Sequence, residues 1–358
     1  MESLKIITIK GFKSIKKCEL KLNNLNILIG SNGAGKSNFI SSFVLLQDIL
    51  DKELQIYTSQ NGINSLFYMG PKETNMIQMD FDFGHNAYGF ALAPTNNSQL
   101  YFIEEYYSYN GTKSIIKSSR GSMESHWDLG VDNLMDHYVI PVLQKREWKV
   151  YHFHDTSKTA KIKQECDVQN NLFLMSDAGN LAAFLLRLKN DFPQNYQMIL
   201  NTVKLVAPFV SDFILKPSGT SKDRIAFKWK QKGCEDVFNS SQLSDGTLRF
   251  ICLTTLLLQP TILQPSTIII DEPELGLHPY AVVLLSDMIK KTQKKVQIII
   301  STQSVDLINE FEAEDIIIVE TGDEGTTFNR LNSEDLQSWL DDYSIGELWK
   351  KNIIGGRP

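Results

Sequence analysis

The chain has 358 residues, of which 42% are hydrophobic, and a formal net charge of −6 at pH 7. This length allows one large domain or two, and the acidic balance excludes a general basic field that would draw in nucleic acid, although a local basic strip remains possible. The four cysteines are far apart and form no Cys-x-x-Cys pair, which favours reduced thiols over a disulfide framework or a zinc site. No apolar run approaches membrane-spanning length and no signal-peptide core opens the chain, so we expect a cytoplasmic protein without a membrane partner.

The first predicted element is a β-hairpin. Residues 4–9 and 15–22 alternate apolar and polar positions around Gly11-Phe12-Lys13-Ser14, which supplies the turn. Lysines occur along the whole hairpin, at Lys5, Lys10, Lys13, Lys16, Lys17 and Lys21. A solvated strand face is the simpler explanation of these lysines, and an edge facing phosphate or nucleic acid is the alternative.

A phosphate-binding loop follows the hairpin. Residues 25–29 are an apolar run, Gly30–Ser37 reads Gly-x-x-x-x-Gly-Lys-Ser, and residues 38–54 have helical periodicity. This strand–loop–helix context is the one that a P-loop requires, because its glycines and the helix N-terminus turn backbone N–H groups toward phosphate. Lys36 suits the β and γ phosphates, and the Ser37 hydroxyl suits Mg²⁺. The residues that we expect to bind nucleotide here are Asn32, Gly33, Ala34, Gly35, Lys36, Ser37 and Asn38.

The middle of the chain is predicted to form antiparallel strands and then helices. Residues 67–90 and 100–109 alternate apolar and polar side chains between turn signals. Residues 148–155 are predicted as a strand with His152 and His154 on one face beside Asp155. This spacing could ligate a metal, but further ligands are not evident. We therefore favour a strand end that delivers a polar residue toward the nucleotide. Residues 180–189 and 196–209 read as two amphipathic helices with a break at Pro193.

The C-terminal half contains a second set of chemical motifs. Ser244 and Asp245 are natural N-cap residues for a helix that runs to about residue 258. Residues 267–270 form a buried strand that ends in Asp271-Glu272-Pro273-Glu274, a Walker B pattern in which Asp271 suits the Mg²⁺ shell and Glu272 suits the attacking water. Further strands (residues 296–300 and 315–320) and helices (residues 279–291 and 304–311) alternate, which predicts a parallel sheet with ligands at the carboxyl ends of its strands.

The order of these motifs resembles the ATP-binding-cassette (ABC) ATPases, in particular the RecF/SMC/Rad50-like branch and its compact bacterial "predicted ATPase" group, relatives of the OLD-type ATPases. Phe12-Lys13-Ser14 matches the N-terminal strand motif of the family, and Gly30–Asn38 matches Walker A. Leu243-Ser244-Asp245-Gly246-Thr247 resembles the signature motif, and Asp271–Pro279 resembles Walker B followed by the D-loop. Ser301–Ser304 lies where the switch histidine loop belongs.

This resemblance implies the fold class, the site and the assembly. The fold is expected to be an α/β ABC-type P-loop NTPase head with a mixed sheet, an antiparallel β subdomain and a helical insertion. A single head over residues 1–358 would comprise an N-terminal lobe (1–155), the insertion (156–212) and a C-terminal lobe (213–358). ATP and Mg²⁺ are the implied cofactors, and two heads are implied to sandwich two ATP molecules in a homodimer. The implied nucleotide contacts also include Lys13, Ser14, Ser244, Asp245 and Gly246.

Three departures from the family pattern affect the expected chemistry. Asp245 and Thr247 replace the usual glycine and glutamine of the signature, while Ser244 and Gly246 still suit a γ-phosphate. Gln303 replaces the switch histidine and cannot titrate, so turnover is expected to be slow. For the Q-loop position, Gln144 competes with the segment His154-Asp155, and we favour the latter.

Two functional interpretations follow. The favoured one is an ATPase switch in DNA repair or anti-phage defence that acts with a separate nuclease or effector, with direct DNA binding possible. The alternative is a nucleotide-gated protein sensor or scaffold with weak hydrolysis and no DNA contact. The signature departure and the SMC-like insertion argue against a transporter motor. The tail residues Trp339, Leu348 and Trp349 suit either a docking surface or, more simply, ordinary packing.

Overall fold

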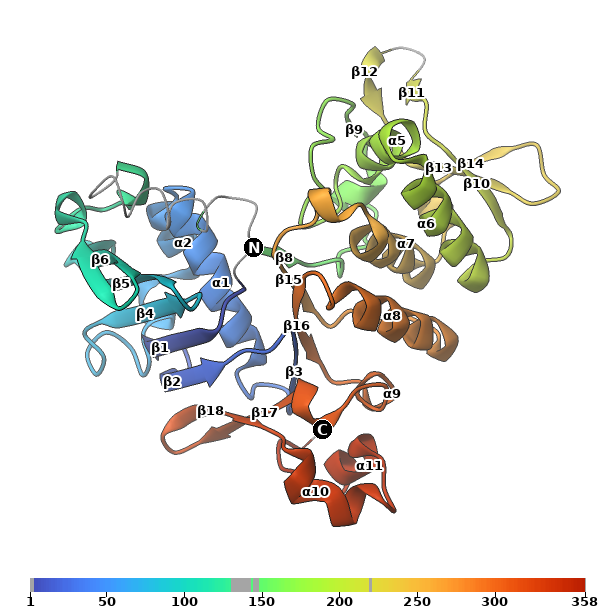
Figure 1. Ribbon diagram of the computed structural model, residues 1–358. Helices are drawn as coiled ribbons and strands as arrows, with labels where there is room; N and C mark the ends of the chain where they lie inside the picture. Colours follow the sequence, from blue (N-terminus) through green and yellow to red (C-terminus); the bar gives the residue numbers. More distant parts are fainter. Residues whose placement is uncertain (1–2, 130–142, 144–147, 219–220, 358) are drawn as a thin grey trace. The chain divides into compact units, whose positions relative to one another are not determined.

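The computed structural model describes residues 3–129, 143, 148–218 and 221–357 (Figure 1). Within these residues the chain forms two compact units. The first comprises Met1–Val150, Pro265–Ile269 and Gln297–Pro358, and the second comprises Tyr151–Gln264 and Ile270–Val296. The three predicted parts of the head, 1–155, 156–212 and 213–358, stay a prediction.

The first unit contains an antiparallel sheet of six strands in the order β2-β1-β4-β5-β6-β7. Every neighbouring pair is antiparallel, and β1 and β2 form the predicted hairpin. The strands are β1 (Ile6–Phe12), β2 (Ile15–Lys21), β4 (Ile77–Asp82), β5 (Asn86–Pro94), β6 (Leu100–Tyr109) and β7 (Thr112–Ile115). The predicted antiparallel β subdomain is therefore confirmed, although the strand expected from residue 67 begins only at Ile77, as β4.

A second sheet has the order β18-β17-β3-β16-β15-β8. Its strands are β3 (Leu25–Ile29), β8 (Trp148–Tyr151), β15 (Thr267–Asp271), β16 (Gln297–Thr302), β17 (Ile316–Gly322) and β18 (Gly325–Arg330). Strand β3 runs parallel to both β16 and β17, whereas β17 and β18 are antiparallel, so the predicted mixed sheet is confirmed. The central strand β3 is buried along its whole length, as expected for a parallel strand covered on both faces.

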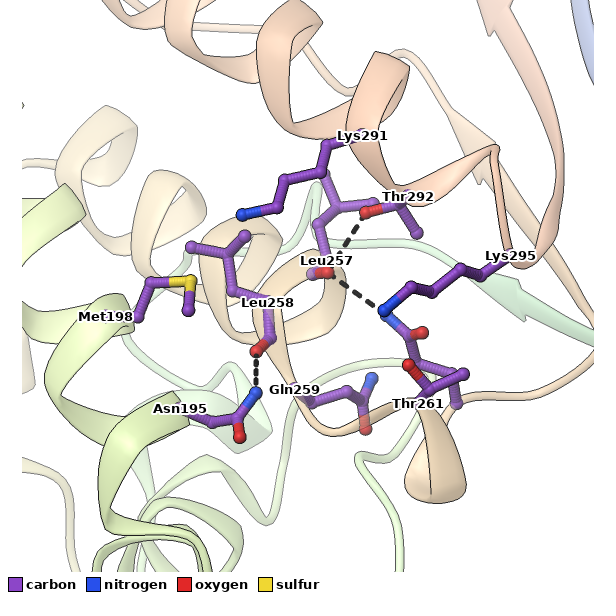
Figure 2. A pocket seen from close by; sticks show the side chains of 10 residues that line it. Asn195, Met198, Leu257, Leu258, Gln259, Thr261, Lys291, Thr292 and Lys295 are labelled. Carbon is purple, nitrogen blue, oxygen red and sulfur yellow. Dashed lines mark hydrogen bonds between the residues drawn. The ribbon is translucent and has the colours of Figure 1, made fainter.

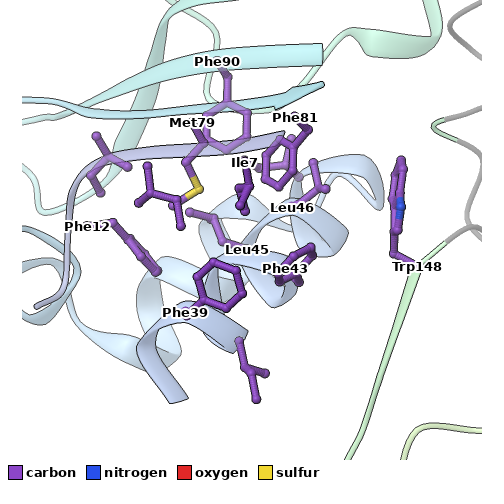
Figure 3. Close-up of a cluster of buried hydrophobic side chains, with 14 of the residues drawn as sticks. Ile7, Phe12, Phe39, Phe43, Leu45, Leu46, Met79, Phe81, Phe90 and Trp148 are labelled. Carbon is purple, nitrogen blue, oxygen red and sulfur yellow. The ribbon is translucent and has the colours of Figure 1, made fainter. Parts of the chain in front are cut away.

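Helix α1 (Lys36–Leu50) carries the core that joins the P-loop to the antiparallel sheet. Phe39 and Phe43 pack edge to face at 5.5 Å, and Phe43 lies 6.2 Å from Phe81 of β4 (Figure 3). The helix ends at Leu50 rather than at residue 54, because the backbone enters the left-handed region at Lys52 (φ +60°). Two short helices follow, α2 (Leu54–Asn61) and α3 (Ile63–Leu66).

The C-terminal part of the first unit forms short helices. These are α9 (Val305–Ile308), α10 (Ser333–Leu340) and α11 (Ile345–Lys350), of which α9 and α11 pack against each other. Helix α9 is much shorter than the predicted 304–311. Ordinary packing is confirmed for Leu348 and Trp349, which are fully buried, whereas Trp339 is 43% exposed.

In the part of the second unit that the structure describes, there are four α-helices and two small antiparallel sheets. The helices are α5 (Leu181–Asp191), α6 (Pro193–Val206), α7 (Asp245–Leu258) and α8 (Pro279–Thr292), packed in series. One sheet has β10 (Val210–Ile214), β13 (Lys228–Gln231) and β14 (Val237–Asn239), and the other has β9 (Cys166–Asp167), β11 (Pro217–Ser218) and β12 (Ser221–Ile225). Pro193 begins α6, a position that tolerates its missing N–H, so the predicted break and the predicted helical insertion are both confirmed.

Two expectations from composition can be compared with the structure. All four cysteines are free thiols, as predicted. Among the described residues, no helix is both long enough and apolar enough to cross a membrane.

Candidate functional site

The P-loop in the first unit is folded as a cradle for phosphate. Gly33 and Gly35 adopt left-handed φ angles of +80° and +109°, and α1 begins immediately afterwards. Lys36 is 5% exposed, and its ammonium group donates hydrogen bonds to the carbonyl oxygens of Gly30 at 2.6 Å and Ser31 at 3.0 Å. A Cβ atom at Gly33 would meet no heavy atom within 4 Å, so the mouth of the loop is open. Ser37 at this mouth is exposed.

Side chains from three distant segments support the cradle from one side. Asn38 donates a hydrogen bond from Nδ2 to the Ser14 hydroxyl at 2.7 Å, and that hydroxyl lies 2.7 Å from the hydroxyl of Thr326 on β18. A Cβ atom at Gly35 would come within 2.3 Å of the same Thr326 hydroxyl. Thr321 donates to the carbonyl oxygen of Ala34 at 3.1 Å. The structure thus brings Ser14, Asn38 and Gly35 together, and it adds Thr326, for which the sequence offered no signal.

Lys13 lies in the β1–β2 turn next to this support. Its backbone is left-handed (φ +50°), and its N–H donates to the carbonyl oxygen of Leu66 at 2.9 Å. Burial lowers the pKa of Lys13 from its ordinary value. The backbone of this predicted contact residue is therefore fixed by local hydrogen bonding.

The switch segment follows the strand that neighbours β3. Strands β16 and β3 are parallel, and Thr302 of β16 pairs with Ile29 of β3. Gln303 directly follows Thr302, and Gly30 directly follows Ile29, so both lie at the carboxyl edge of the sheet. Ser304 caps α9, and its N–H is held by the Thr302 hydroxyl at 2.9 Å. Gln303 is half-buried between these fixed neighbours. The predicted juxtaposition of the switch segment and the P-loop strand is therefore present within the first unit.

The Walker B residues belong to the second unit, where His154 supports them. Strand β15 ends at Asp271, and its backbone carbonyl oxygen accepts a hydrogen bond from His154 Nε2 at 2.7 Å. Glu272 has a left-handed φ of +44°, which is unusual for a residue with a Cβ atom and is typical of functional sites. The Oδ1 atom of Asp271 is buried and has no hydrogen-bond partner among the described residues.

The predicted strand over residues 148–155 is wrong in its second half. Strand β8 ends at Tyr151, so neither His152 nor His154 lies on a strand face. Within the described residues, no group of three or more histidine, cysteine, aspartate or glutamate side chains could hold a metal ion. The other candidate for the Q-loop position, Gln144, lies outside the described residues. His154 is therefore the member of this segment that contacts the end of the Walker B strand.

The signature segment forms the N-terminus of α7 in the second unit. Ser244 is the N-cap, as predicted, and its hydroxyl accepts a hydrogen bond from the Thr247 N–H at 3.2 Å. Asp245 pairs with Lys163 at 3.2 Å. A Cβ atom at Gly246 would lie 2.2 Å from the carbonyl oxygen of Gly276, so only glycine allows this close approach of the signature helix to the D-loop.

Arg249 of the signature helix α7 forms hydrogen bonds with both the D-loop and the His154 segment. Its guanidinium group donates to the carbonyl oxygens of Leu275 at 2.9 Å, His154 at 2.7 Å and Phe153 at 3.2 Å. The signature helix, the D-loop and the His154 segment therefore form one connected piece. Sequence reasoning missed Arg249 and Lys163, because their partners are backbone atoms or residues far away in the chain.

The P-loop of the first unit suits the phosphates of ATP, and the Asp271 carboxylate of the second unit suits Mg²⁺. The open glycine cradle offers N–H donors at a helix N-terminus, where anions are favoured. Burial of a carboxylate oxygen without a partner costs free energy, and a bound cation would supply the missing partner for Asp271 Oδ1. Within the second unit, Asp271 is the residue suited to hold Mg²⁺, which would neutralise phosphate charge when bound.

Comparisons with known proteins address the fold and the family. Residues 168–309 match a family described as "AAA domain, putative AbiEii toxin, Type IV TA system", and residues 2–89 match a family of unknown function, DUF2813. The structure is similar to an SMC head bound to the C-terminal winged-helix domain of ScpA, with a TM-score of 0.61, 16% identity, and coverage of 94% of this chain and 99% of the other. In fold, the chain resembles the head domains of SMC proteins.

A second solved structure supports the same SMC-like fold. It is an Smc head with an extended coiled coil, bound to the C-terminal domain of ScpA derived from Pyrococcus furiosus. Its TM-score is 0.58 at 16% identity, with 96% of this chain and 99% of the other covered. A comparison with curated proteins finds no match. The predicted resemblance to the SMC-like branch is confirmed at the level of the fold.

Proposed function

We propose that the protein hydrolyses ATP at sites shared between two copies of the chain. The observation that carries this proposal is the P-loop cradle, in which Lys36 is held by the carbonyl oxygens of Gly30 and Ser31 while the mouth at Gly33 stays open. On binding, the Lys36 ammonium group would exchange these carbonyl contacts for the β and γ phosphates. Lys13, Ser14, Asn32, Ala34, Gly35 and Asn38 would line or support the same loop.

The chemical step assigns one role to each of two side chains. The Glu272 carboxylate would orient a water molecule and take its proton as the water oxygen bonds to the γ-phosphorus and the bond to the bridging oxygen breaks. Gln303 would orient the γ-phosphate or that water through its amide, which has a donor and an acceptor but does not titrate. The left-handed backbone of Glu272 supports this assignment, because strain of this kind accumulates at functional positions.

The second copy would complete the site through its signature helix. The N-terminus of α7 offers the Ser244 hydroxyl and backbone N–H groups near Gly246 to an anion. Asp245 replaces the usual glycine, and Lys163 offsets its charge. ATP would then join two heads, and loss of the γ-phosphate would separate them, which gives a nucleotide-driven switch.

For biological context, we propose a role in anti-phage defence or DNA repair together with a separate effector or nuclease. The description of the matched AAA family, a toxin of a toxin–antitoxin system, favours the defence setting. The SMC heads of similar fold are bound to a ScpA domain, which makes a protein partner a reasonable expectation for this chain as well. The alternative, a nucleotide-gated sensor with weak hydrolysis and no DNA contact, is favoured by the net charge of −6 and by Gln303.

Phosphate release by the purified chain with ATP and Mg²⁺ tests the proposed activity. Lys36→Ala should abolish ATP binding, and Glu272→Gln should preserve binding while it lengthens the life of the ATP-bound dimer. Wild-type turnover by Glu272→Gln would exclude Glu272 as the water-orienting group. DNA binding that weakens steeply with salt would support the DNA role, and absence of such binding with and without ATP would favour the sensor.

A further inference from the structure

A pocket in the second unit shares no residue with the proposed nucleotide site. It has a volume of about 230 Å³ and lies where α6, α7 and α8 converge (Figure 2). Met198, Leu257 and Leu258 supply apolar lining, while Gln259, Lys291 and Lys295 supply polar lining. Pockets for small molecules usually measure about 300–1,000 Å³, so this one suits a single large side chain better than a nucleotide.

The pocket contains a buried acceptor that lacks a donor. Gln259 is 4% exposed, and its Nε2 donates to the carbonyl oxygen of Leu256 at 2.8 Å. Its Oε1 atom is buried and has no hydrogen-bond partner within the part of the chain that the structure describes. By contrast, Asn195 donates to Leu258 and Thr292 donates to Leu257 (Figure 2). Because an unpaired buried acceptor is costly, an entering N–H group is the complement that this site requires.

The rim of the pocket is basic. Four lysines occur within six residues at the end of α8 and just beyond it, at Lys290, Lys291, Lys294 and Lys295, in a chain whose net charge is −6. Ile262, which follows the lining residue Thr261, is 82% exposed, and Met198 is 40% exposed. An acidic segment with one large apolar side chain would therefore complement both the charge and the surface of this pocket.

The chain itself contains such a segment, helix α10. It has no buried residue, although Leu336, Trp339 and Leu340 follow the spacing that places apolar side chains on one helix face. Acidic residues flank this face: Glu334, Asp335, Asp341 and Asp342. Trp339 is 43% exposed, and an indole carries one N–H donor and no acceptor.

We propose that α10 of one copy docks into this pocket of a second copy. The Trp339 indole enters between the apolar side chains, its N–H donates to Gln259 Oε1, and the flanking carboxylates face the lysines of the rim. The contact joins two different surfaces, so repetition produces either a closed ring or an open chain of copies. It requires no nucleotide, and it therefore goes beyond the proposed ATPase function and stands or falls separately from it.

A peptide-binding experiment tests the docking directly. The probe is a labelled synthetic peptide of residues 332–343, and the receptor is the full chain carrying Trp339→Ala, without nucleotide. Saturable binding is expected, and replacement of the tryptophan in the peptide by alanine should weaken it about thirtyfold, as for a buried aromatic anchor. Lys291→Glu with Lys295→Glu should weaken it about tenfold or more and reduce its salt dependence. Lys5→Glu with Lys21→Glu, the same charge change on the exposed β1–β2 hairpin, should leave it unchanged.

The mass of the full chain in solution shows whether α10 of a second copy occupies the pocket. Without nucleotide, sedimentation should show a mass that rises with concentration for the wild type and for Lys36→Ala, and a constant mass for Trp339→Ala. Failure of the peptide to bind, or peptide binding combined with a concentration-independent wild-type mass, would overturn the proposal. Displacement of the peptide by a short DNA duplex, with no change in mass, would instead assign the lysines to nucleic acid and would also overturn it.

Discussion

His154 donates a hydrogen bond from Nε2 to the backbone carbonyl oxygen of Asp271 over 2.7 Å. The two residues lie 117 positions apart, and Arg249 binds the carbonyl oxygen of His154 at 2.7 Å. The end of the Walker B strand is thus fixed through its backbone, while the carboxylate oxygen Oδ1 of Asp271 remains without a partner among the described residues. Because His154 binds the backbone of Asp271, the Oδ1 atom of its carboxylate is left to coordinate a cation.

His154→Ala should weaken the use of Mg²⁺ more than the binding of ATP. Loss of the backbone anchor lets the Asp271 carboxylate move, and loss of an outer-shell support typically costs about tenfold in metal affinity or activity. The Mg²⁺ concentration that gives half-maximal ATPase activity should rise, while ATP binding measured without Mg²⁺ should not change. The matched control is His85→Ala, an exposed histidine in the turn between β4 and β5. Equal Mg²⁺ dependence in both variants would show that the anchor has no such role.

Thr326→Val should weaken ATP binding by relaxing the P-loop support. The substitution conserves shape but removes the hydroxyl that meets Ser14, and one hydrogen bond of this kind contributes about 1 kcal/mol. The dissociation constant for ATP should therefore rise about fivefold. Thr326→Ser should restore binding, and Thr327→Val, at the exposed neighbouring position, should leave it unchanged. A wild-type affinity for Thr326→Val would contradict the supporting role of β18.

Much of this arrangement could be predicted from the sequence, because local patterns determine it. The apolar run before Gly30, the cap at Ser244 and the acidic end of β15 each specify an element and its chemistry within about ten residues. The parallel pairing of Thr302 with Ile29 follows from alternation of strands and helices, which forces crossover connections.

The supporting contacts could not be predicted, because they connect residues that no local pattern relates. Ser14 meets Thr326 across 312 positions, and Arg249 recognises backbone carbonyl groups that carry no sequence signal. The end of β8 at Tyr151 was missed for a related reason. The alternating pattern through Phe153 resembles a strand, but His154 leaves the ladder to bind the Asp271 carbonyl. Tertiary hydrogen bonding overrides local periodicity at this position.

Lys163→Met should impair dimer formation rather than nucleotide binding. The Lys163 side chain is 9% exposed; it donates to the carbonyl oxygen of Thr156 and pairs with Asp245 of the signature segment. Without it, the charge of Asp245 at the α7 N-terminus is left to repel the γ-phosphate of the other copy. In a Glu272→Gln background, Lys163→Met should shorten the ATP-bound dimer lifetime. The control is Lys161→Met, which removes an exposed pair with Asp177; equal lifetimes in the two variants would refute the role of Lys163.

Asp48→Asn should stabilise the protein at neutral pH. Burial, reinforced by Glu53 and Asp51, raises the pKa of Asp48 from 3.8 to about 6, so the folded state binds a proton more tightly than the unfolded state. The free energy of unfolding therefore falls as the pH rises from about 4 to about 6 and stays reduced above that range. After allowance for partial exposure, the gain for asparagine at pH 7 is about 1 kcal/mol.

Unfolding midpoints at pH 7 and below pH 4 measure this effect of Asp48. Asp48→Asn should unfold a few degrees higher than the wild type at pH 7 and at the same temperature below pH 4. Glu19→Gln, at an exposed position on β2, should change neither midpoint. An equal gain for Asp48→Asn at both pH values would show that the carboxylate charge is not the cause.

The most direct test of the shared site is complementation between two inactive variants. One chain carries Lys36→Ala and lacks the phosphate cradle, and the other carries Ser244→Arg, which blocks the signature contact. Neither should hydrolyse ATP alone. When they are mixed in equal amounts, half of the dimers should hold one intact site, which restores about a quarter of wild-type activity. Activity of Ser244→Arg alone at the wild-type level, or no recovery on mixing, would contradict a site built from two copies.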